Sequence, residues 1–100
     1  MQLLHVALQD GFIHEDVIVR VNDEAVFQKK DVNTRFQIGF ADSFELNVQD
    51  GKNKVEIVLP SKQRSESQTL EISKPMYLSI SITSDETIEF RASDESFKYL

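Results

Sequence analysis

The chain has 100 residues and a formal net charge of −6, with 17 acidic residues against 11 basic ones. A chain of this length predicts a single domain, residues 1–100, with one hydrophobic core. The negative charge disfavours nucleic acids and anionic membranes as partners, because both carry phosphate groups that it would repel. The absence of cysteine excludes disulfides, thiolate metal sites and cysteine nucleophiles.

The N-terminal residues lack the basic and apolar segments of a signal peptide. No apolar run approaches the roughly 20 residues that a membrane-spanning helix needs. We therefore expect a cytoplasmic protein without membrane insertion, although a domain cut from a longer exported protein would show the same pattern.

Apolar and polar residues alternate along most of the chain, which is typical of strands with one buried face. No segment keeps a period of 3.6 residues over three turns, so we expect no substantial helix and at most one helical turn, over 93–98. In chain order, the alternation predicts strands at 4–8, 17–21, 25–28, 36–40, 44–48, 55–59, 70–72, 76–82 and 88–90.

A turn at 50–51 predicts a hairpin between the segments 44–48 and 55–59. Its register follows from the apolar pattern, because pairing Val48 with Val55 places three apolar pairs on one face. A slip of one residue would set apolar side chains opposite polar ones.

Two further hairpins are predicted from turn residues. The turn at 22–24 would join 17–21 to 25–28, and a turn at 84–86 would pair Ile82 with Ile88.

Short strands at near-regular spacing, each with one apolar face, predict an all-β, antiparallel sandwich of about seven to nine strands, Ig-like or transthyretin-like. Pro60 and Pro75 stand at strand boundaries, where a missing N–H does no harm. Residues 61–68 contain no apolar side chain, and we expect them to form an exposed polar loop.

His14 is the best candidate for acid–base or metal chemistry, with Asp10 or Asp16 as its partner. Consecutive strand residues point to opposite faces, however, so the cluster around His14 is more typical of a solvated turn. No serine stands in a nucleophile-elbow pattern and no glycine-rich phosphate loop is present. The sequence therefore predicts no catalytic residue, no metal and no cofactor, and a hydrolase is the weakest interpretation.

Several apolar, aromatic and basic residues fall where an outward face or an exposed segment is expected. Ile18, Val58 and Tyr77 occupy nominally polar positions of their strands. Rings near the C-terminus would either offer a contact surface or fold back to close one end of the sandwich. The candidate interaction residues are Ile18, Val58, Arg64, Tyr77, Phe97 and Tyr99.

Two segments, 17–26 and 48–57, resemble small bacterial β-sandwich accessory modules of the PEGA-like or Ig-like kind. Those modules place a short hairpin near the start and a glycine-bearing hairpin in the middle. The resemblance implies a β-sandwich and carries no functional residue over to this chain.

These observations predict a non-enzymatic binding or protein–protein interaction module. Its partner would be another protein or a second copy, bound through an edge strand, a sheet face or residues 61–68. The alternative is a carbohydrate or small-ligand binding domain that uses Tyr77, Phe97 or Tyr99.

Overall fold

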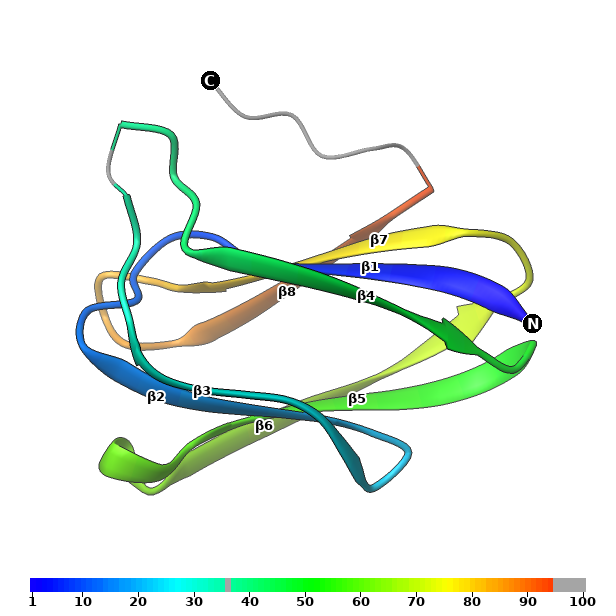
Figure 1. The fold of residues 1–100 in the computed structure, drawn as a ribbon, viewed down its shortest axis with the longest axis horizontal. Coiled ribbons are helices and arrows are strands. Elements are labelled where there is room, and N and C mark those ends of the chain that lie inside the picture. The colour runs from blue at the N-terminus through cyan, green and yellow to red at the C-terminus, as the bar shows by residue number, and fades with distance from the viewer. Residues whose placement is uncertain (36, 95–100) are drawn as a thin grey trace.

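The structure, a computed structural model, describes residues 1–35 and 37–94. Within these residues, eight strands form two four-stranded sheets that pack face to face (Figure 1). The first sheet has the order β4-β1-β7-β8 and the second β3-β2-β5-β6. The elements are β1 Gln2–Leu8, β2 Glu15–Val21, β3 Glu24–Val32, β4 Asp42–Val48, β5 Gly51–Leu59, the 3₁₀ turn η1 Pro60–Lys62, β6 Arg64–Ile72, β7 Met76–Ile82 and β8 Ile88–Ser93.

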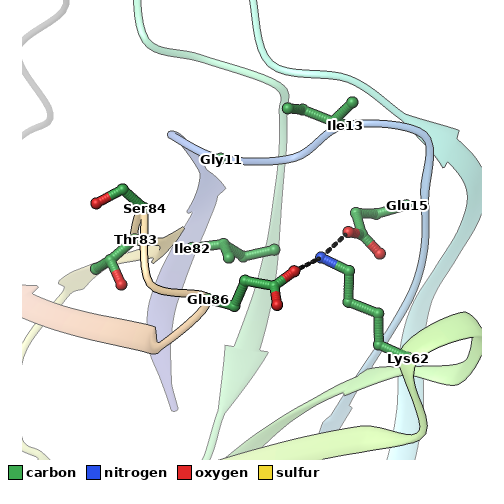
Figure 2. A pocket seen from close by; sticks show the side chains of 8 residues that line it. All are labelled: Gly11, Ile13, Glu15, Lys62, Ile82, Thr83, Ser84 and Glu86. Atoms are coloured by element: carbon green, nitrogen blue, oxygen red, sulfur yellow. Dashed lines mark ion pairs between the residues drawn. The ribbon is translucent and has the colours of Figure 1, made fainter.

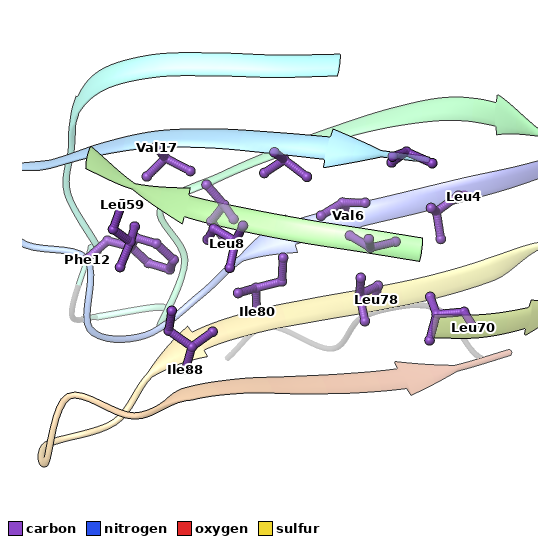
Figure 3. Close-up of a cluster of buried hydrophobic side chains, with 14 of the residues drawn as sticks. Leu4, Val6, Leu8, Phe12, Val17, Leu59, Leu70, Leu78, Ile80 and Ile88 are labelled. Carbon is purple, nitrogen blue, oxygen red and sulfur yellow. The ribbon is translucent and has the colours of Figure 1, made fainter. Parts of the chain in front are cut away.

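The core lies between the sheets and is made of the alternating apolar residues of each strand (Figure 3). Leu4, Val6 and Leu8 show the pattern in β1, since all three are fully buried. Phe12, from the β1–β2 connection, is also fully buried. Each such side chain contributes about 1.5–3 kcal/mol through burial, which explains why the period of two dominates the sequence.

The predicted all-β sandwich of seven to nine strands is confirmed, and so are two of the three predicted hairpins. β7 pairs with β8 with Ile82 opposite Ile88. β2 pairs with β3 through the two-residue turn Asn22-Asp23. Both turn residues have positive φ, +53° and +68°, as a type I′ turn requires.

The predicted hairpin between 44–48 and 55–59 is wrong. β4 pairs with β1 in the first sheet, whereas β5 pairs with β2 and β6 in the second. Apolar alternation fixes which face of a strand is buried, but not which sheet holds the strand. Val48 and Val55 both enter the core, and they do so from opposite sheets.

The connection from β4 to β5, which crosses from one sheet to the other, is stabilised by the buried side-chain amide of Asn53. The side-chain nitrogen of Asn53 donates to the carbonyl of Gln49 at 2.9 Å and to that of Gly51 at 3.2 Å. Its side-chain oxygen accepts a bond of 2.9 Å from Asn22, in the β2–β3 turn. This fully buried side chain therefore fixes both neighbouring connections.

Two other predicted segments differ from the structure. Residues 37–39 form a turn closed by a bridge between Arg35 and Phe40, not a strand, and residue 36 lies outside the described residues. Residues 61–68 are exposed apart from the half-buried Arg64, but they are not a loop, because η1 ends at Lys62 and β6 starts at Arg64. Residues 64–69 of β6 contain no apolar side chain and gain their strand structure from pairing with β5, whereas Leu70 and Ile72 enter the core.

The pairing of β1 with β7 is parallel, unlike the other five pairings, so the prediction of a wholly antiparallel sandwich is also wrong in that detail. The strand order differs from the immunoglobulin order, in which the first, second, fourth and fifth strands share a sheet.

The helical turn predicted over 93–98 lies mostly outside the described residues. Residue 93 is the last residue of β8, and residues 95–98 are not described.

Candidate functional site

The strand β6 is an edge strand of the second sheet, and most of its residues are exposed. It pairs with β5 in one unbroken register from Leu59–Arg64 to Gly51–Ile72. Residues 65–69 and 71 are exposed, and no described strand lies beyond β6. An edge of this kind presents a row of backbone N–H and C=O groups to solvent.

The backbone directions in β6 follow from hydrogen bonds of Lys54 in β5. Its carbonyl accepts from the Asn22 N–H at 2.9 Å, and its own N–H donates to the Asn22 side-chain oxygen at 2.9 Å. Both backbone groups of Lys54 therefore point towards β2, away from β6. Antiparallel strands alternate between hydrogen-bonded and non-bonded pairs, so Thr69, opposite Lys54, points its N–H and C=O to the open edge.

The same alternation extends along β6. Every second residue turns both backbone groups to the open edge, while the residues between them bond to β5. We call the outward set the free-edge residues: Ser65, Ser67, Thr69 and Glu71.

The edge strand β3, at the other end of the same sheet, is protected in ways that β6 is not. Its pairing with β2 contains two register shifts, which bend the strand and disturb its edge. It also carries Lys29 and Lys30, and lysine on an edge opposes strand pairing. Lys29 bonds to Asp42 of β4 at 2.7 Å, and Phe27 stacks on Phe44 of β4 with ring centroids 4.7 Å apart. β3 and β4 therefore close one side of the sandwich together.

A groove of about 580 Å³ lies at one end of the sandwich, beside the start of β6 (Figure 2). We call it the Lys62 groove. Its lining residues are Gly11, Ile13, Glu15, Lys62, Ile82, Thr83, Ser84 and Glu86.

The charged groups of the Lys62 groove are bound to one another. The Lys62 ammonium lies 2.6 Å from a carboxylate oxygen of Glu15 and 3.4 Å from one of Glu86. The Glu15 side chain is 3% exposed and that of Lys62 is 32% exposed. The hydrogen bond to Glu15 raises the pKa of Lys62 above its ordinary value of 10.5, against a smaller opposing effect of burial. Lys62 is thus a cation that neutralises a buried carboxylate, which gives the groove a structural role.

Of the predicted interaction residues, Arg64 is the first residue of β6, and Ile18 and Val58 lie on the two strands next to it in the sheet. Ile18 and Val58 are opposite one another on the outer face of the second sheet, and both are half-buried. Ser65 of β6 is the next residue across from Val58. Arg64 donates a hydrogen bond to the carbonyl of Glu86, so it ties the start of β6 to the β7–β8 turn.

The predicted aromatic platform is only partly described. Tyr77 lies on the outer face of the first sheet and stacks on His5 with ring centroids 4.5 Å apart. His5 also contacts a carboxylate oxygen of Glu45 at 3.0 Å. One face of the Tyr77 ring is therefore covered by this stack. Phe97 and Tyr99 lie outside the described residues.

His14 finds a different acidic partner from the two that the sequence suggested. Its ring nitrogen lies 2.7 Å from a carboxylate oxygen of Asp31, and both side chains are largely exposed. This hydrogen bond, with one from Asn33, lowers the pKa of the Asp31 carboxyl. The Asp16 carboxylate accepts a hydrogen bond of 3.2 Å from the backbone N–H of Asp31, so it stabilises the end of β3. Within residues 1–35 and 37–94, no three His, Cys, Asp or Glu residues are grouped to hold a metal.

Comparisons with family models, with curated proteins and with solved structures find no match to this chain. The resemblance to PEGA-like or Ig-like modules therefore stays a prediction. In the part of the chain that the structure describes, no helix has the length and apolar character needed to cross a membrane.

Proposed function

We propose that this chain is a non-enzymatic protein-interaction module that binds an extended segment of its partner by strand addition at β6. The observation that carries the proposal is the unbroken nine-residue register of an exposed edge strand. In strand addition, main-chain hydrogen bonds supply affinity and alternate side chains supply specificity.

The side chains of β6 suit this role. On the outer face, Ser65, Ser67 and Thr69 are small and hydroxylated, so a partner strand can approach closely. Proline is absent from β6, and its only basic residue, Arg64, is turned towards the β7–β8 turn. Three devices that commonly block an edge, a bulge, a proline and a lysine, are missing from this strand, although it carries the charged residues Arg64, Glu66 and Glu71.

The half-buried pair Ile18 and Val58 adds a second contact. It lies on the outer face, separated from the open edge by Ser65. Val58 would lie two strands away from the added strand, about 9.5 Å across the sheet, so only a long apolar side chain that crosses the small Ser65 would reach it. This arrangement would give the partner a preference for an apolar residue at that position.

The test removes one outward N–H without touching the β5–β6 ladder. In Ser67→Pro, the N–H that is lost points to the open edge, where proline is tolerated. The matched control is Ser67→Ala, which removes the hydroxyl and keeps the N–H. Circular dichroism and chemical denaturation establish that each variant is folded.

Each protein is immobilised and used to capture partners from a cell lysate, with a separately tagged copy of the same chain included. We expect the wild type and Ser67→Ala to retain the same proteins and Ser67→Pro to lose them. If Ser67→Pro is unfolded, Thr69→Pro tests the same edge. Retention of the same proteins by a folded proline variant would overturn the proposal.

A further inference from the structure

The edge of β6 is complementary to a second copy of itself. We propose that two copies of the chain pair β6 against β6, antiparallel, about a two-fold axis at Gln68, so that two four-stranded sheets become one of eight strands. This inference rests on the proposed function, because it names the partner of that same edge. Closed two-fold pairing is the commonest form of self-association.

The backbone directions restrict the register. Because the free-edge residues alone point outwards, they must pair with one another across the new interface. Registers shifted by one residue are excluded, since they would set an outward-pointing residue against one that already bonds to β5. Centring the pair on Gln68 uses the whole strand. The resulting pairs are Ser65–Glu71, Ser67–Thr69, Arg64–Ile72, Glu66–Leu70 and Gln68–Gln68.

The charges of β6 are compatible with this register and disfavour larger shifts. The strand carries two acidic residues, Glu66 and Glu71, and one basic residue, Arg64. In the register centred on Gln68, Glu66 faces Leu70 and no carboxylate faces another. Sliding the partner towards either end until Glu66 faces Glu66, or Glu71 faces Glu71, places like charges directly opposite, which is destabilising.

The small hydroxylated residues also match across the axis. Ser67 lies opposite Thr69 on the outer face, and opposed hydroxyl pairs of this kind stabilise antiparallel sheets. The net charge of −6 on each copy opposes association over a longer range. Because salt screens that repulsion, the dimer should become stronger as ionic strength rises.

Because the chain contains no cysteine, a single introduced cysteine can test the register by disulfide cross-linking. In Gln68→Cys, the two new thiols face one another at the two-fold axis, in a non-bonded pair whose Cβ atoms lie about 4.5–5.5 Å apart, close to disulfide distance. The control is Glu66→Cys, at a position that is also exposed but faces Leu70. The two control thiols are then four residues apart along the sheet, about 13 Å, too far to bond.

After mild oxidation, we expect Gln68→Cys to form a disulfide-linked dimer at least about ten-fold faster than Glu66→Cys. Sedimentation of the wild type should show a monomer–dimer equilibrium that shifts to dimer at higher salt, and Ser67→Pro should remain monomeric. Equal cross-linking of the two cysteine variants, or a wild type that stays monomeric at all concentrations, would overturn the inference.

The failure of this inference is distinguishable from the failure of the proposed function. If the wild type is monomeric but another protein is captured and then lost with Ser67→Pro, the second copy is the wrong partner and strand addition stands. If neither a copy nor any protein is retained in a way that depends on the Ser67 N–H, both are wrong.

Discussion

Replacing Lys62 with methionine is expected to destabilise the fold, because it leaves the carboxylate of Glu15 without its cation. Methionine keeps most of the apolar length of the side chain and removes the ammonium group, with its charge and its hydrogen bonds. The Glu15 side chain is 3% exposed, so it cannot recover the lost contact from water. Breaking a buried ion pair by removing one partner costs about 3–5 kcal/mol. Lys62 is itself about one-third exposed, and we therefore expect a loss of about 2 kcal/mol in the free energy of unfolding.

Lys74 provides the matched control for this change. Its ammonium also lies 2.6 Å from a carboxylate, that of Asp94, and the hydrogen bond raises the pKa of Lys74 as well. Both side chains of this pair are at least half exposed. Exposed ion pairs contribute little, so Lys74→Met should leave the free energy of unfolding almost unchanged. Urea denaturation at neutral pH compares the two variants with the wild type.

The stabilisation of the fold by Lys62 should also decrease at high pH. A lysine whose pKa is raised by folding stabilises the fold fully below its unfolded pKa, here 10.5, and loses that effect as pH rises through the folded pKa. The difference between wild type and Lys62→Met should therefore be constant from about pH 7 to pH 10 and shrink above about pH 10.5. Equal stability of Lys62→Met, Lys74→Met and wild type would refute the argument that Glu15 depends on Lys62.

Three further predictions concern the connections and the edge, each measured by chemical denaturation. Gly11→Ala should cost about 3 kcal/mol or more, because φ is +87° and the added Cβ would lie 1.9 Å from the Ile82 carbonyl oxygen. Gly51→Ala, at φ +105° with no atom within 4 Å, should cost only about 1–2 kcal/mol, and equal losses would contradict the steric reasoning. Asn53→Ala should cost about 1–3 kcal/mol because it leaves the Gln49 carbonyl without its buried donor, whereas a neutral result would show that water replaces the amide. Ser67→Pro should lower stability by less than Gln68→Pro, since only the latter removes a ladder bond to β5; the reverse order would contradict the assigned backbone directions.

The sequence predicts the faces of the strands well and their partners less well. Val17, Val19 and Val21 are buried as the alternation requires, because hydrophobic burial acts residue by residue. Which strands share a sheet depends on contacts between distant parts of the chain. The apolar pattern of 44–48 and 55–59 fits a hairpin and a crossing between sheets equally well, and the buried amide of Asn53 favours the crossing.

The candidate site was predicted only in part, for the same reason: residues 61–68 and an edge strand were both expected as contact regions, but not that residues 64–68 belong to that strand. Residues 61–68 show no apolar alternation, because the side chains at the start of β6 are exposed on both faces of the strand and do not enter the core. Its strand conformation comes from β5, a partner that no local pattern reveals. The pairing of Lys62 with Glu15, and of His14 with Asp31, likewise joins residues distant in the sequence. By contrast, the adjacency of Ile18 and Val58 agrees with their predicted outward positions.

Amide hydrogen exchange, resolved by residue, tests the central claim about β6 most directly. In dilute protein, the free-edge amides of Ser65, Ser67 and Thr69 should exchange quickly, while those of Glu66 and Gln68 should be protected by their bonds to β5. In the assembled protein, dimer or complex, the free-edge amides should become protected. Protection that appears on β3, β4 or the Lys62 groove instead, with the free-edge amides still exchanging quickly, would contradict the account.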